Sequence, residues 1–183
     1  RSDREILARL SKRVERKEPL ALFNMAIEYG NGDLGMPVDQ TKCIELLRLS
    51  AGLGCHAALF KLGQFHITGD MGLEQNEEEA LKYWEKAAEG GHIFSLNNVG
   101  NAHFRNGDHV AAMRHWRLSA SEGFRYSMPN LIFRFEDGFL HHADLAETLQ
   151  NFYRARAEMK SEDRDQWIAH LKRTGKYDAD CEG

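Results

Sequence analysis

Apolar residues near the start of the chain recur with the period of a helix. In the segment PLALFNMAIEY, Leu22, Met25, Ala26 and Tyr29 fall at positions i, i+3, i+4 and i+7. This spacing puts all four on one face of an α-helix, and nothing in the segment alternates with the period of two that a half-buried strand requires. The pattern therefore predicts a helix.

The same pattern returns after 37 residues. The matching pairs include Ala21-Leu22-Phe23 with Ala58-Leu59-Phe60, Gly32 with Gly69, Gly35 with Gly72, and Gly54 with Gly91. A period of this length indicates supersecondary units that stack to share one core. We therefore predict an all-α fold, an α-solenoid of antiparallel helix pairs.

The stretch GNGDLG, residues 30–35, has the glycine spacing of a dinucleotide-binding loop. That fingerprint works only between a buried strand and a helix, where a pyrophosphate lies on the helix N-terminus. Here the preceding segment is helical, and the second copy has Ile67 at the place of Gly30. We predict a turn between two helices and no phosphate site.

Each unit holds two helices. In the second unit, helix A covers residues 56–67 and is ended by Gly69, which can take the left-handed conformation of a C-cap. Helix B follows Asn76, the expected N-cap. The third unit has a shorter loop. The expected organisation is an N-terminal capping helix at 1–18, repeats at 19–55, 56–92 and 93–124, a degenerate fourth repeat at 125–160, a C-terminal capping helix at 161–175 and a frayed tail at 176–183.

Both ends show features of caps. Ser2 and Glu5 have the spacing of a capping box, and Ile6, Leu10 and Val14 form a stripe that can cover the first repeat. Near the C-terminus, Ser161 is an expected N-cap, and Trp167 and Leu171 are offered to the last repeat.

Composition narrows the function classes. A net charge of -4 and a pI near 6.2 argue against a nucleic-acid partner. No apolar run approaches the roughly 18 residues of a membrane span, and no signal peptide is recognisable. Three widely spaced cysteines without a C-x-x-C favour free thiols in a reducing compartment, the cytoplasm, with the nucleus left open. Because the chain begins at Arg1, we expect a processed product or an excerpt.

No motif for catalysis is present, and we expect no enzyme activity, no cofactor and no metal site. His66 and His103 occupy the repeat position of Tyr29, which favours packing with a polar tip. Trp84 and Trp116 share a helix B position with Leu47, so we predict that they lie in the core.

Several in-phase motifs resemble two related families. The long-loop units, with Leu62-Gly63, residues 69–72 and the run EEALKYWEKAAEGG at 78–91, are similar to Sel-one-like repeats. The third unit, VGNAHFRNGD at 99–108, resembles a tetratricopeptide repeat. The resemblance implies a solenoid used for protein–protein interaction. Residues 1–15 also resemble a segment that follows a RING-like zinc finger in some algal relatives, although its cysteines are absent here.

The resemblance further implies a concave groove lined by the A helices. Its residues here are Phe23, Ile27 and Asn31 in the first unit, Ala57, Phe60, Gln64, Ile67 and Thr68 in the second, Phe94, Asn97, Asn101, Phe104 and Arg105 in the third, and Phe133 in the fourth. Asn101 could hydrogen-bond a peptide backbone, and the phenylalanines could be apolar anchors or could pack on the next repeat. The lysine of the family's carboxylate clamp is replaced by Asn97.

Two functions follow from these observations. The chain is expected to be an adaptor that binds a protein or peptide in the groove. The alternative is the substrate-recruiting part of a larger enzyme, such as a RING-type ubiquitin ligase. Neither the partner nor the oligomeric state follows from the sequence.

Overall fold

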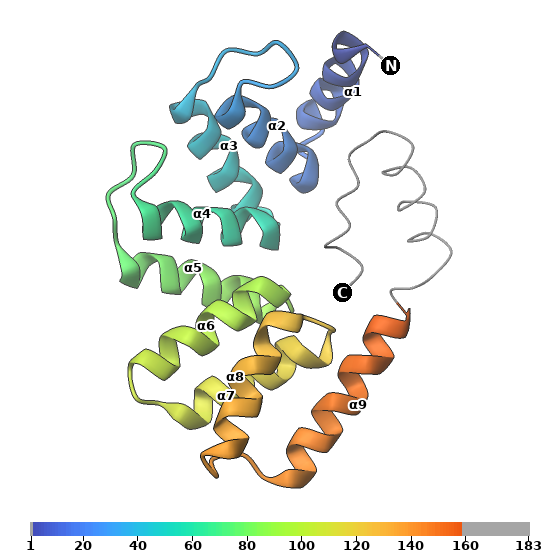
Figure 1. Ribbon diagram of the computed structural model, residues 1–183. Helices are drawn as coiled ribbons and strands as arrows, with labels where there is room; N and C mark the ends of the chain where they lie inside the picture. Colours follow the sequence, from blue (N-terminus) through green and yellow to red (C-terminus); the bar gives the residue numbers. More distant parts are fainter. Residues whose placement is uncertain (1, 159–183) are drawn as a thin grey trace. The chain divides into compact units, whose positions relative to one another are not determined.

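The computed structural model describes residues 2–158, which form α-helices and one short 3-10 helix and contain no strand (Figure 1). The all-α prediction is confirmed. The elements are α1 Asp3–Glu15, α2 Pro19–Asn31, α3 Gln40–Gly52, α4 His56–Thr68, α5 Glu77–Glu89, α6 Ile93–Arg105, α7 His109–Ser121, η1 Arg125–Ser127, α8 Met128–Glu136 and α9 His142–Glu158. The expected C-terminal capping helix and tail lie outside the described residues.

The chain divides into two compact units between His115 and Trp116, inside α7. The first unit contains α1 to α6 and the start of α7. The second contains the rest of α7, η1, α8 and α9.

Helix pairs build the first unit. In Figure 1, α2 with α3 and α4 with α5 are successive antiparallel pairs, and each pair packs on the next through α3 with α4 and α5 with α6. The first helix, α1, packs on α2. This is the stacking of helix pairs that the 37-residue period predicts.

The loops inside the two complete pairs are built alike. Gly32 and Gly69 end α2 and α4 in the left-handed region, with φ of 74° and 75°. Each loop is then closed on the end of its first helix: the Asp39 N–H donates to the Tyr29 carbonyl (2.9 Å), and the Asn76 N–H donates to the His66 carbonyl (2.7 Å). The segment GNGDLG therefore connects two helices, as predicted.

Side-chain caps fix where the second helix of each pair begins. Asp39 accepts from the Lys42 N–H (2.9 Å), and Asn76 accepts from the Glu79 N–H (3.0 Å). The capping box expected at Ser2 is not formed: Ser2 is the N-cap of α1, but its hydroxyl makes no capping bond. The Ser2 carbonyl accepts the Ile6 N–H (3.2 Å), as in a regular α-helical turn, and also the Glu5 N–H (2.9 Å).

The core lies between the pairs. Ala26, Leu47, Leu62 and Phe65 are buried together, and Cys43 is buried among them. Burial raises the pKa of the Cys43 thiol, partly offset by the charge of Lys61. A continuous apolar layer thus joins the first pair to the second.

Trp84 is a large buried side chain of the second pair. It is 7% exposed, and its Nε1 donates to the Phe60 carbonyl (3.2 Å). A Cβ on Gly63 would lie 2.4 Å from that nitrogen, so the indole requires glycine there. The equivalent residues of the first pair are Ala26 and Leu47, both fully buried. The predicted core placement of Trp84 and Leu47 is confirmed, as is that of Trp116, which is 3% exposed.

The first helix covers the first repeat with part of its apolar stripe. Leu10 is buried against Ala21 and Met25, and Val14 packs on the same cluster. Ile6, the third member of the stripe, remains 39% exposed. This end of α1 is therefore open to other contacts.

Histidines at the shared repeat position pack with their rings, as expected. The His66 ring stacks on Tyr83 (centroids 5.6 Å apart), and the His103 ring stacks on His115 (5.2 Å).

The second unit is held by a buried leucine and an ionic cluster. Leu131 of α8 is fully buried. Arg117, in the last part of α7, contacts Asp144 (2.8 Å) and Glu147 (3.1 Å) and donates to the Thr148 hydroxyl (3.2 Å). These contacts fix α9 to the end of α7.

Candidate functional site

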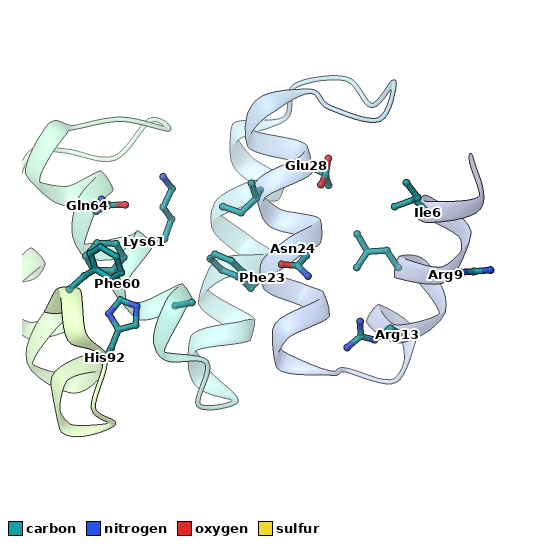
Figure 2. Close-up of a pocket in the computed structure, with 14 residues that line it drawn as sticks. Ile6, Arg9, Arg13, Phe23, Asn24, Glu28, Phe60, Lys61, Gln64 and His92 are labelled. Atoms are coloured by element: carbon teal, nitrogen blue, oxygen red, sulfur yellow. The ribbon is translucent and has the colours of Figure 1, made fainter. Parts of the chain in front are cut away.

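The first unit contains an open groove of about 700 Å³, which we call the α1–α4 groove. Its lining comes from four helices and the residue before one of them (Figure 2). The lining residues are Ile6, Arg9, Leu10, Arg13, Phe23, Asn24, Ile27, Glu28, Ala57, Phe60, Lys61, Gln64, His92 and Phe94.

Figure 2 shows the arrangement of these side chains. Phe23 and Asn24 of α2 lie in the middle. Arg9 and Arg13 lie on α1 to one side, and Phe60 and the start of α6 lie to the other. The groove therefore has a floor from α2 between two walls, one from α1 and one from α4 and α6.

An aromatic cluster forms one wall. The Phe60 ring lies 4.7 Å from the His92 ring and 5.6 Å from the Phe94 ring, measured between centroids. Phe94 is 45% exposed although it belongs to this cluster. Large apolar side chains that stay exposed in a concave site are typical anchors for a bound partner.

His92 is the N-cap of α6 as well as a groove residue. Its Nδ1 accepts from the Ser95 N–H (3.3 Å), and the Ser95 hydroxyl lies 3.0 Å from the same atom. Burial lowers the pKa of His92, and the nearby charge of His56 lowers it further. The capping bond needs a ring nitrogen that carries no proton, so the lowered pKa and the cap support each other.

The charges of the groove are mainly positive. Arg13 pairs with Glu18 (2.6 Å), and the Lys61 ammonium lies 4.9 Å from the centre of the Phe65 ring. Arg9 makes no ion pair within residues 2–158. The lining contains one carboxylate, Glu28, whose pKa is raised by burial and by the charge of Asp33.

Glu28 also has an unsatisfied oxygen. Its Oε2 is buried and accepts no hydrogen bond from the part of the chain that the structure describes. A buried acceptor in this state costs free energy that a donor from a ligand would recover.

The structure brings together about half of the groove residues expected from sequence. Phe23, Ile27, Phe60, Gln64 and Phe94 all line the α1–α4 groove, with Ala57.

The remaining expected residues do not line it. Asn97 and Asn101 are half-buried, and the Phe104 ring packs on His109 (5.1 Å). Arg105 pairs with Glu77 and lines a separate pocket of about 490 Å³ beside α5, because it is the last residue of α6 and reaches the start of α5. Phe133 belongs to the second unit, where it is 55% exposed. Asn97, Asn101, Phe104 and Arg105 therefore lie outside the lining of the α1–α4 groove.

Sequence reasoning missed the contribution of α1 and four polar residues of the lining, Asn24, Glu28, Lys61 and His92. Asn24 and Lys61 are 37 residues apart and so share a repeat position, which could have identified them. Arg9 and Arg13 have no equivalents in the repeats, and only the packing of α1 on α2 brings them to the groove.

Residues 2–158 contain neither a cluster of metal-ligating side chains nor a helix suited to cross a membrane. No group of three or more His, Cys, Asp or Glu side chains in this range could hold a metal ion. No helix in this range has both the length and the apolar composition needed to cross a membrane.

Stacked helix pairs with equivalent loops and an open groove define an α-helical repeat protein. The sequence model of the Sel1 repeat matches residues 19–55 and 56–92, the two complete helix pairs of the first unit. The predicted resemblance to Sel-one-like repeats is confirmed.

Solved structures with the same fold include a Sel1 repeat protein from Oxalobacter formigenes, with 24% identity and a TM-score of 0.63 over 68% of this chain and 96% of that one. Another is a protective antigen of uropathogenic Escherichia coli with an SLR fold, at 22% identity and a TM-score of 0.63, covering 93% of this chain and 37% of that one. Both show the fold alone.

Among curated proteins, the chain is similar to chitin synthase regulatory factor 2 of Schizosaccharomyces pombe. The two are 26% identical over 134 residues, or 70% of this chain. The matched region spans 26% of that relative's length.

Proposed function

We propose that this chain is a protein-interaction module, an adaptor or scaffold, and that its α1–α4 groove binds a segment of a partner protein. The observation that carries the proposal is the exposed aromatic wall. Phe94 is 45% exposed beside Phe60, in a concave site whose floor also presents Phe23. Such convergent apolar side chains with a few polar groups are what a protein-binding groove requires.

Polar groups in the groove add hydrogen-bonding capacity. The side-chain amides of Asn24 and Gln64 both line it and make no hydrogen bond to other residues in the range 2–158. An amide can both donate to and accept from a peptide backbone. The groove therefore offers apolar burial together with backbone recognition.

The proposal assigns the chain a binding role and no catalysis. Sel1 repeats are typical of proteins that bind other proteins, and the fungal relative is named as a regulatory factor of an enzyme. The alternative, the recruiting part of a RING-type ubiquitin ligase, stays a prediction.

The compartment belongs to the proposal too. Cys43 and Cys55 are free thiols, which fits a reducing compartment such as the cytoplasm.

Peptide selection tests the proposal. Peptides that bind the full chain are selected from a random display library, and their Kd values are measured by fluorescence anisotropy. Phe94→Ala should weaken binding at least about tenfold, equivalent to roughly 1.4 kcal/mol. Leu49→Ala is the matched control, because Leu49 is 44% exposed on α3 and does not line the groove. If Phe94→Ala and Leu49→Ala give equal Kd values and unchanged melting curves, the peptides do not bind in the groove.

A further inference from the structure

We infer that the occupant of the α1–α4 groove is an extended, acidic peptide segment in which carboxylates flank one bulky apolar side chain. The inference rests on the proposed function and specifies its partner chemistry.

Charge is the first argument. Three cations line the groove, Arg9, Arg13 and Lys61, against one carboxylate, Glu28. The whole chain carries a net charge of -4, so this local excess of positive charge runs against the composition. A positive site with apolar walls attracts segments of opposite charge and disfavours basic ones.

The positions of the cations give the second argument. Arg9 belongs to α1 and Lys61 to α4, on opposite walls of the groove (Figure 2). Arg9 and Lys61 have no ion-pair partner in the described range, whereas Arg13 is partly neutralised by Glu18. Two available cations on either side of an apolar floor match carboxylates on either side of an apolar side chain.

The apolar floor gives the third argument. Phe23 lies between the two walls, and Phe60, whose ring lies 5.6 Å from the Phe94 ring, stands at one side of it. An aromatic or leucine side chain buried against these rings would supply the main free energy of binding. The flanking charges would then decide which apolar segments bind.

The unsatisfied oxygen of Glu28 decides the conformation of the occupant. The negative charge of Glu28 repels an acidic ligand unless the ligand also donates a hydrogen bond to this carboxylate. The Glu28 Oε2 is buried and accepts no hydrogen bond from the described residues. An extended segment has free backbone N–H groups, whereas the N–H groups inside a helix are already used. Asn24 and Gln64 can serve the same backbone. An extended segment therefore offers backbone donors to Glu28 along its whole length, whereas a helical one offers only those of its first turn.

Three synthetic nine-residue peptides test the inference on the full chain. All have a central Leu-Phe pair, flanked by Glu in the acidic peptide, by Gln in the neutral one and by Lys in the basic one. By fluorescence anisotropy near 0.1 M salt, the acidic peptide should bind at least about tenfold more tightly than the neutral one, and the basic one should bind most weakly. The difference should shrink at 0.5 M salt, because exposed charges are screened.

Charge reversal locates the effect. Lys61→Glu and Arg9→Glu should each weaken the acidic peptide several-fold and strengthen the basic one. Arg48→Glu is the control, since Arg48 is exposed on α3 outside the groove and its reversal changes the net charge equally. It should change either Kd less than about twofold. Isotope-labelled acidic peptide should show backbone chemical shifts of an extended chain when bound.

The outcomes separate this inference from the proposed function. Equal binding of acidic and neutral peptides, lost in both cases in Phe94→Ala, overturns the charge preference and leaves the groove in place. Helical shifts of the bound peptide overturn the extended conformation. If none of the three peptides binds, the inference is overturned. Binding of the display-selected peptides then tests the groove itself. An equal response to Arg48→Glu and Lys61→Glu would show that net charge, not the groove, attracts the peptide.

Discussion

Gly63 and Trp84 show how one residue pair adapts a repeat. The indole of Trp84 occupies the space that a Cβ on Gly63 would need, at 2.4 Å from Nε1. At the equivalent positions the first repeat has Ala26 and Leu47, both fully buried. A large residue on helix B is thus paired with a small one on helix A.

A swap between the repeats tests this pairing. Gly63→Ala should destabilise the protein by about 1–3 kcal/mol through overpacking. Trp84→Leu should also lower stability by leaving a cavity, by less than the roughly 3–5 kcal/mol expected for Trp84→Ala. In the double variant Gly63→Ala/Trp84→Leu, which copies the first repeat, the loss in unfolding free energy should be smaller than the sum of the two single changes, with a coupling of about 0.5–3 kcal/mol. Denaturant unfolding of the four proteins measures it, and additive losses would show that the two sites do not touch.

His92 predicts a pH dependence of stability. Folding lowers its pKa from the ordinary value of 6.5, so the folded state binds fewer protons than the unfolded state as the ring titrates. Its contribution to stability is complete above that value and is lost as the pH falls through the lower folded pKa. His92→Asn keeps a capping acceptor that does not titrate. Thermal melts between pH 5 and 8 should show a weaker loss of Tm at low pH for this variant, and an unchanged profile would mean that other groups cause the loss.

At the scale of the element, the helices and their loops could be predicted from sequence because they repeat. The in-phase glycines identified Gly32 and Gly69 as helix ends, and both have positive φ. The predicted capping box at Ser2 is wrong, because residue spacing shows only that two groups are close enough along the helix to bond. In the structure the Ser2 hydroxyl makes no capping hydrogen bond. The start of α9 at His142 carries no repeat signal, so the repeat pattern could not place it.

Two glycines with different φ angles test the loop geometry. Gly69 has a φ of +75°, so Gly69→Ala should destabilise the protein by about 1 kcal/mol or more. Gly52 is the last residue of α3 and a Cβ there would meet nothing within 4 Å. Gly52→Ala should therefore be neutral or stabilising by up to about 1 kcal/mol. Melting temperatures of the two variants check the contrast, and a similar loss in both would contradict it.

At the scale of the whole molecule, the repeat phase predicted the part of the site that repeats. Phe23 and Phe60 lie one period apart and both line the groove. Arg105 follows the same logic but pairs with Glu77, because a helix end can reach the neighbouring helix. Arg9 could not be placed from sequence, since a non-repeating cap is positioned only by tertiary packing.

Removal of one period tests the modular architecture. Deleting residues 56–92 removes 37 residues and joins α3 to α6 in register, whereas deleting residues 63–92 removes 30 and does not. Because neighbouring pairs contribute similar interfaces, the first deletion should give a folded, less stable helical protein. The second should lose its cooperative melting transition. Circular dichroism melts compare them, and equal behaviour would argue against interchangeable repeats.

Because Cys43 is buried between the first two repeats, the rate of its alkylation measures how often this interface opens. Its thiol is fully enclosed and its pKa is raised, so it reacts with an alkylating reagent only when the interface opens. Cys55, at the N-cap of α4, is half-buried and should react much faster. In a Cys181→Ser background, the labelling rate of Cys43 by mass spectrometry would report how often the repeats separate. Residues of α2 and α4, from the first and the second repeat, both line the α1–α4 groove. A peptide bound there at saturation should therefore slow the labelling of Cys43 and leave the labelling rate of Cys55 nearly constant.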